Sequence, residues 1–201
     1  DISILRALSL YTEVGFTQGA EVLFARDPSF RHPQTRVRVT RFELDKGSDN
    51  YLDDRVLNGP LVKAFEQTLA AVRQHVNTAS TFEPGEVQRQ DRQDYPLEAL
   101  REGLVNAFAH RDYSGFSGGL SVSIYPGRIE IWNSGRLPKE LDIRDLRTNH
   151  PSLPVNPDIA HVLYLRRLME RIGRGTQKII RACGDHNLPA PKRTDKESGG
   201  T

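Results

Sequence analysis

The chain has 201 residues, enough for one large or two small domains with a real core, and its formal net charge is only +2. This near balance excludes a protein that is strongly cationic over its whole surface, although a local basic patch remains compatible. No apolar run approaches the roughly 20 residues that a membrane helix needs, and Cys183 is the only cysteine. These features favour a cytoplasmic protein without membrane contact, and we expect the chain to be part of a longer protein.

The N-terminal third is predicted to contain helices, a strand and another helix. Residues 2–12 and 17–25 have the pattern of short helices, the second with Thr17 as its N-cap. Residues 36–43 alternate basic and apolar side chains, which is typical of a half-buried strand. After a polar turn at 46–50, a helix is predicted from Pro60 to about residue 76.

The predicted strand carries three arginines, Arg36, Arg38 and Arg41, on what we interpret as its outer face. These side chains could contact the phosphates of a nucleic acid. A run of this kind is more often only a solvated surface, so both interpretations stay open.

A change of composition follows this helix. Residues 77–84 are rich in Ser, Thr and Pro, so we place a domain boundary there, between residues 1–77 and 78–201. Residues 86–92 form a weak candidate strand.

The next helix, residues 98–112, has two unlike faces. One is an apolar stripe that would bury against a sheet, formed by Leu97, Leu100, Leu104, Ala107 and Phe108. The other carries Glu102, Asn106 and His110 at four-residue spacing, with Gly103 beside them. Glycine costs about 1 kcal/mol in a helix interior, which suggests close approach of a backbone or ligand. A carboxylate and an amide one turn apart suit a metal-and-water site; the alternative is a polar surface helix with an incidental glycine.

A β-hairpin is predicted next, from residues 120–125 and 128–132, with Pro126 and Gly127 in a type II turn. Asn133 ends the second strand on the same face as Ile129 and Ile131, where a ligand-facing polar group would lie. Gly135 follows, and the long segment 136–155 has the length of a lid or binding loop.

The last predicted elements are two helices, from Pro157 to about residue 171 and from Gln177 to about residue 184, with Asn156 as the first N-cap. Between them lie Gly173, Arg174, Gly175 and Thr176. Glycines and a cation before a helix N-terminus favour an anion site. The same residues would also suit a simple interhelical turn, with Gly173 after the first helix and Thr176 capping the second.

The common nucleotide-binding motifs are missing from the sequence: it has no P-loop and no dinucleotide-binding glycine motif. What remains is an ordered trio at residues 98–113, 129–138 and 171–176. Together these three stretches resemble the GHKL ATPase superfamily, and most closely the divergent ATPase-like domain of RecG-like or Schlafen AlbA-type transcriptional regulators. The resemblance covers about residues 80–190. Residues 1–76 resemble the end of the AlbA-like nucleic-acid-binding domain that precedes it in such proteins.

This resemblance implies an α/β fold: a GHKL (Bergerat-like) sheet-and-helix sandwich preceded by part of an AlbA-like α+β domain. It implies that Glu102 is the general base, that Asn106 is the Mg²⁺ ligand, and that residues 133–135 hold adenine. Residues 136–156 would be the nucleotide lid, and residues 173–176 the phosphate loop. The superfamily has Asp where this chain has Asn133, so selectivity for adenine is open.

The resemblance therefore predicts an ATP-binding, DNA-associated regulator that uses ATP and Mg²⁺, with weak ATPase activity and homo-oligomerisation as open possibilities. The alternative is a degenerate GHKL scaffold that no longer binds nucleotide. A translocating helicase is not expected, because the chain has no P-loop and no second motor domain.

Overall fold

The computed structural model describes residues 1–45, 50–76, 78–81, 90–116, 118–148, 151, 153–170 and 174–194, with backbone alone at 78–81 and 90–93. Its elements in chain order are α1 (Ile2–Ala7), β1 (Tyr11–Thr12), β2 (Gly15–Phe16), α2 (Gln18–Phe24), η1 (Pro28–Phe30), η2 (Pro33–Thr35), β3 (Val37–Phe42), β4 (Tyr51–Leu57), α3 (Leu61–His75), β5 (Thr78–Thr81), β6 (Gln90–Gln93), α4 (Leu97–Ala109), β7 (Leu120–Tyr125), β8 (Arg128–Asn133), η3 (Asp145–Arg147), α5 (Pro157–Leu165) and α6 (Gly175–Asp185).

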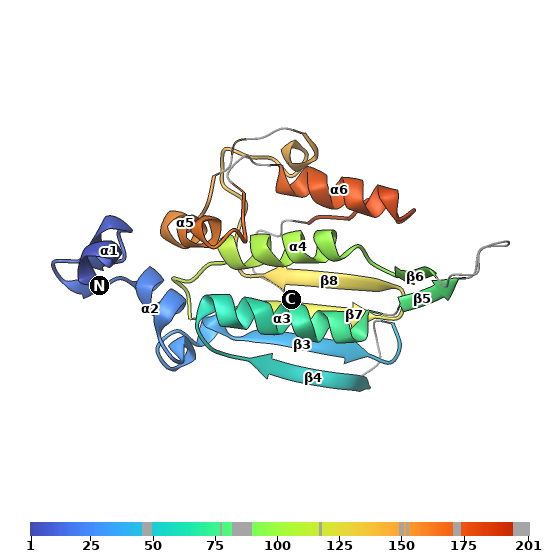
Figure 1. The fold of residues 1–201 in the computed structure, drawn as a ribbon, viewed down its shortest axis with the longest axis horizontal. Coiled ribbons are helices and arrows are strands. Elements are labelled where there is room, and N and C mark those ends of the chain that lie inside the picture. The colour runs from blue at the N-terminus through green and yellow to red at the C-terminus, as the bar shows by residue number, and fades with distance from the viewer. Residues whose placement is uncertain are drawn as a thin grey trace.

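A mixed four-stranded sheet lies at the centre, in the order β4–β3–β7–β8 (Figure 1). β3 is antiparallel to β4 and parallel to β7, and β7 pairs with β8 as the predicted hairpin. Val37, Val39 and Val122 are fully buried on one face, as expected of strands whose side chains alternate. The predicted mixture of helices and sheet is confirmed.

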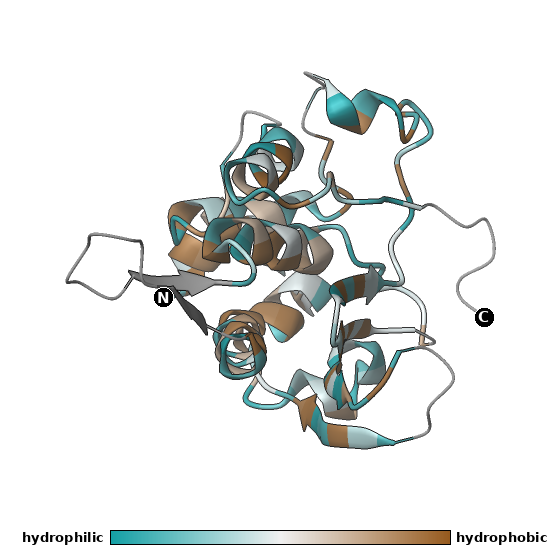
Figure 2. Cartoon of the chain, turned by 90° about the vertical axis from the view of Figure 1, so that its right-hand side faces the viewer, coloured by the Kyte–Doolittle hydropathy of each residue, from teal (hydrophilic) through white to brown (hydrophobic). Residues whose placement is uncertain are grey.

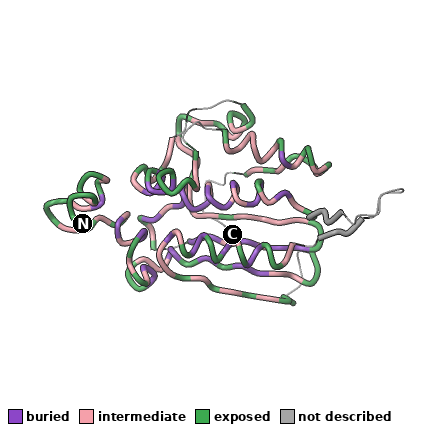
Figure 3. Tube along the Cα trace, in the orientation of Figure 1, coloured by how far each residue is buried: buried purple, intermediate pink, exposed green. Residues whose placement is uncertain are grey.

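Helices form a second layer on one face of the sheet. In the view along the strands, α3 and α4 lie on one side of the sheet (Figure 2). The rings of Phe65 in α3 and Phe108 in α4 meet edge to face at 5.7 Å between centroids. α6 and α5 pack on α4 in turn, so α4 is buried on nearly all sides (Figure 3). None of the described helices is long and apolar enough to cross a membrane.

Some local predictions were wrong. The first helix ends at Ala7, because Ser9 takes a left-handed φ of 57°, and β1 and β2 follow as a small hairpin. Strand β4 was not predicted: its alternation is interrupted by three consecutive charged residues and by a bulge opposite Arg41 and Phe42. Gly127 is not left-handed, so the hairpin turn is not of type II.

The boundary predicted near residue 77 falls within one sheet. β3, from before it, is hydrogen-bonded to β7, from after it, over five residue pairs. Residues from both sides also share one hydrophobic core, as the contact of Phe65 with Phe108 shows. The division into an AlbA-like and a GHKL-like part thus stays a prediction from sequence resemblance. In the fold, strands from the two parts form one sheet.

Candidate functional site

Helix α4 places Glu102 and Asn106 side by side one turn apart. Leu100, Leu104 and Phe108 follow the four-residue spacing of one helix face and are buried in the core. The opposite face is also covered, and Glu102 is only 8% exposed. The side-chain amide of Asn106 donates a hydrogen bond of 3.1 Å to Glu102 Oε1. The pair therefore lies beneath another element and not on a solvated surface.

The element that covers the pair is the N-terminal turn of α6. A Cβ atom added to Gly175 would lie 1.9 Å from Glu102 Oε1 and 3.3 Å from Asn106 Nδ2. Real non-bonded atoms do not approach so closely, so only the bare backbone of a glycine fits against this carboxylate. The structure thus joins two motifs that are more than 60 residues apart in the sequence.

The other residues of the predicted phosphate loop are less closely placed. Arg174 is exposed and forms the N-cap of α6, without a side-chain capping hydrogen bond. Thr176 lies inside the first turn, so the alternative in which it caps a helix starting at Gln177 is wrong. Gly173 lies outside the described residues. The anion-binding potential of this turn comes from its position at the N-terminus of an 11-residue helix, where the helix dipole favours negative charge.

Burial also sets the electrostatics of Glu102. Desolvation is the largest influence and raises the pKa of its carboxyl group above the ordinary value of 4.5. The hydrogen bond from Asn106 and the positive charges of Lys178 and Arg101 act in the opposite direction. A buried carboxyl group with a raised pKa is suited to accept a proton near neutral pH.

The turn after β8 packs on the far end of α4. The backbone N–H of Gly135 donates a hydrogen bond of 2.6 Å to Asn133 Oδ1. A Cβ at Gly135 would lie 1.7 Å from the carbonyl oxygen of His110, so here too only glycine fits. Eight residues of helix separate Glu102 from His110, which corresponds to about 12 Å. The two glycine contacts therefore mark opposite ends of one stretch of α4.

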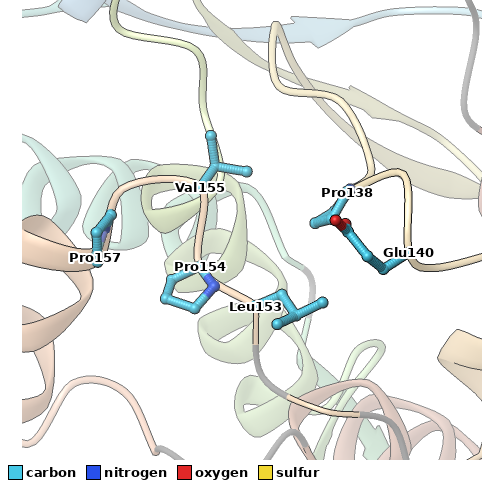
Figure 4. Close-up of a pocket in the computed structure, with 6 residues that line it drawn as sticks. All are labelled: Pro138, Glu140, Leu153, Pro154, Val155 and Pro157. Atoms are coloured by element: carbon cyan, nitrogen blue, oxygen red, sulfur yellow. The ribbon is translucent and has the colours of Figure 1, made fainter.

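A surface pocket of about 450 Å³ opens in the predicted lid segment (Figure 4). It is lined by Pro138, Glu140, Leu153, Pro154, Val155 and Pro157. Asn156, between two of these residues, donates from its amide to the carbonyl oxygens of Ala109 at 2.9 Å and of Arg111 at 2.7 Å. The pocket is thereby tied to the same end of α4 as Gly135. The sequence predicts a lid over this segment but not this pocket, because its two walls come from residues 13 or more positions apart.

The contact that explains the glycine at position 103 is one with a side chain of the sheet. A Cβ at this position would lie 3.2 Å from Ile131 Cδ1 of β8. The glycine therefore lets α4 approach a side chain of the sheet, and no protein backbone outside this helix lies within 4 Å of the added Cβ among the described residues.

The three arginines do not share one face: Arg36 lies just before β3, and Arg38 and Arg41 lie within it. Arg38 forms a two-point ion pair with Asp54, with both nitrogen–oxygen distances at 2.8 Å. Arg41 points to the helix side and donates to the carbonyl oxygen of His75 at 2.8 Å. Arg36 is exposed, and its carbonyl oxygen accepts from Arg111. The prediction that the three arginines form one basic outer face is therefore wrong.

Arg111 is a structural feature that sequence reasoning missed. Its side chain is fully buried and donates to the carbonyl oxygens of Thr35 at 2.9 Å and Arg36 at 2.7 Å. Its guanidinium also lies near the rings of Phe108 and Tyr113. The cation thus ties the end of α4 to the segment before β3. The aromatic residues on either side were the available indication in the sequence.

Comparisons with known proteins agree with the fold. The chain matches the crystal structure of the DIP2311 protein from Corynebacterium diphtheriae with a TM-score of 0.72 and 19% identity, over 90% of this chain and 35% of that one. The chain thus spans about a third of that protein's length, and at this identity the likeness shows the fold alone. No curated protein matches the chain. Residues 118–199 match the family described as "Putative ATP-dependent DNA helicase recG C-terminal", which confirms the resemblance of the motifs to RecG-like ATPase domains.

Proposed function

We propose that this protein binds Mg²⁺-ATP along α4, with the phosphates near Glu102 and Asn106. The observation that carries this proposal is the contact of the Gly175 backbone with Glu102. It brings a helix N-terminus, a carboxylate and an amide to one place, and those groups suit a phosphate–magnesium unit. The proposal draws on the match to a RecG-like ATPase family for the identity of the nucleotide.

Within this site the two side chains have different roles. The amide oxygen of Asn106 is the metal ligand, since Mg²⁺ prefers oxygen and retains several waters. When bound, the ion would neutralise and orient the phosphates. Glu102, with its raised pKa, holds and orients the attacking water for slow hydrolysis.

In this proposal the protein acts in the cytoplasm as a DNA-associated regulator. Arg38 and Arg41 are engaged within the chain, so DNA contact by this part would have to rely on Arg36 or on competition for the other two. Salt-dependent retention on duplex DNA measures this role. A retention that does not change with salt, or that survives neutralisation of all three arginines, would exclude DNA binding through this strand.

A second candidate function is a scaffold module that has lost nucleotide binding. Two observations favour it: the backbone of α6 lies directly on Glu102, and Asn133 Oδ1 is engaged with Gly135. In that case the protein's own groups occupy the positions that a nucleotide would take.

Isothermal titration with Mg²⁺-ATP separates the two candidates. Binding that is lost in Glu102→Ala and Gly175→Ala supports the nucleotide site. The matched control is Glu98→Ala, which removes an exposed carboxylate from the same helix and should leave binding unchanged. No heat with the wild type supports the scaffold. Turnover that is abolished by Glu102→Gln while binding persists would establish hydrolysis.

A further inference from the structure

In the turn after β8, the side chain of Asn133 already makes a hydrogen bond within its own turn. Its Oδ1 accepts the Gly135 N–H at 2.6 Å, which uses one of its two lone pairs. The lone pair that remains belongs to a neutral amide, and an ionised carboxylate is the stronger acceptor for an amino group of a base. A carboxylate near the same end of α4 would therefore be the better acceptor.

The lid pocket supplies one. Among the described residues that line it, Glu140 is the only charged side chain, and the others are proline, leucine and valine. Figure 4 shows Pro138 and Glu140 on one side and Leu153, Pro154 and Val155 on the other, with the Glu140 carboxylate extending toward the space between them. Apolar walls with a small number of polar groups that fix orientation are usual in small-molecule sites.

The pocket is also placed correctly for a nucleotide whose phosphates lie at Glu102. One wall continues from Gly135, which packs on the carbonyl oxygen of His110, and the other is fixed through Asn156 to Ala109 and Arg111. Both walls thus meet the C-terminal end of α4, while Gly175 contacts Glu102 about 12 Å away along the helix. The pocket and Glu102 therefore lie toward opposite ends of this stretch of α4.

We propose that Glu140, and not Asn133, accepts the exocyclic amino group of a purine base bound between Pro138 and Leu153–Val155. This inference rests on the proposed nucleotide site and names its specificity residue. A carboxylate has only acceptor oxygens, so it favours any base edge that presents N–H groups. Adenine offers its 6-amino group, and guanine offers its 2-amino group together with N1–H. The pocket should therefore bind aminopurines of both kinds.

The test pairs a change in the protein with a change in the ligand. Titrations use the Mg²⁺ complexes of ATP, GTP and purine riboside triphosphate, which lacks an exocyclic amino group. With the wild type, purine riboside triphosphate should bind about tenfold more weakly than ATP, the usual effect of losing one hydrogen bond to a charged group. In Glu140→Ala this ratio should fall to about one. In Asn133→Ala it should stay at about ten. Lys139→Ala, an exposed neighbour outside the pocket lining, controls for general effects on the lid.

The possible outcomes distinguish a failure of the role of Glu140 from a failure of the proposed nucleotide binding. A ratio unchanged in Glu140→Ala, or one that falls to one in Asn133→Ala, would overturn the role of Glu140 while nucleotide binding stands. No binding of any triphosphate by the wild type would overturn both. GTP that weakens in Glu140→Ala as ATP does supports the role and adds guanine as a second base. GTP that binds as before in that variant would contradict the expected recognition of guanine by Glu140.

Discussion

Substitution of Gly135 by alanine tests the packing of the β8 turn on α4. The new Cβ would lie 1.7 Å from the backbone carbonyl oxygen of His110 and 2.8 Å from Asn133 Oδ1. Atoms in contact need about 3.5 Å, so the turn and the helix end must separate by more than about 1 Å. Backbone on both sides resists this movement. Overpacking of this kind costs about 1–3 kcal/mol, and the hydrogen bond from Gly135 to Asn133 is strained as well. We expect Gly135→Ala to lower the free energy of unfolding by about 2–3 kcal/mol.

Urea denaturation followed by circular dichroism measures this value. The matched control is Gly127→Ala in the tip of the same hairpin, where a Cβ would meet nothing within 4 Å and the backbone is not left-handed. The control should change stability by no more than about 0.5–1 kcal/mol, in the stabilising direction, because alanine restricts the unfolded chain. Equal effects of the two substitutions would refute the close packing of Gly135 on His110.

Three further predictions follow from the same structure. In α6, Gly184→Ala should stabilise the protein by up to about 1 kcal/mol through helix propensity, because a Cβ there meets nothing within 4 Å. Gly175→Ala should destabilise the protein, because it forces the buried Glu102 out of place. Thermal melts that shift in the same direction for both variants would contradict this. Burial raises the pKa of Glu102 above 4.5, so the folded protein binds this proton more tightly than the unfolded chain does, and ionised Glu102 destabilises the fold above its folded pKa. Glu102→Gln should therefore be more stable than the wild type at pH 7 and lose that advantage as the pH falls toward 4.5. A gain in the free energy of unfolding that does not vary with pH in denaturation curves would contradict the burial of the charge. Arg111→Leu should cost about 3 kcal/mol because a buried carbonyl oxygen and a partly buried one lose their donor. The exposed control Arg181→Leu should change stability by less than about 0.5 kcal/mol.

Local sequence patterns were sufficient to predict the elements that have one regular apolar face. Helix α4 and the β7–β8 hairpin were predicted to within about one to three residues, because the spacing of Leu100, Leu104 and Phe108 and the alternation of Ile129 and Ile131 depend only on local geometry. Strand β4 escaped prediction for the converse reason. Asp53, Asp54 and Arg55 hide its alternation, and their ion pairs with His75 and Arg38 form only in the folded sheet.

The candidate site shows the same division. The four-residue spacing of Glu102 and Asn106 predicts that they lie together, and they do. The sequence could not show that Gly103 faces Ile131, or that Arg41 and Arg38 point to opposite faces with partners of their own. Those facts depend on which neighbour each element has in the sheet and helix layers.

By itself, the sequence determined the amphipathic helix, the hairpin and the order of three motifs that resemble a nucleotide-binding family. Only the tertiary structure decided that α6 covers Glu102, that Gly135 packs on the end of α4, and that residues between 138 and 157 form a pocket with Glu140 in its lining. The physical reason is the range of the interactions. Helix and strand patterns arise between residues a few positions apart, whereas burial of a carboxylate or close approach to a glycine arises from segments that meet only after the chain has folded.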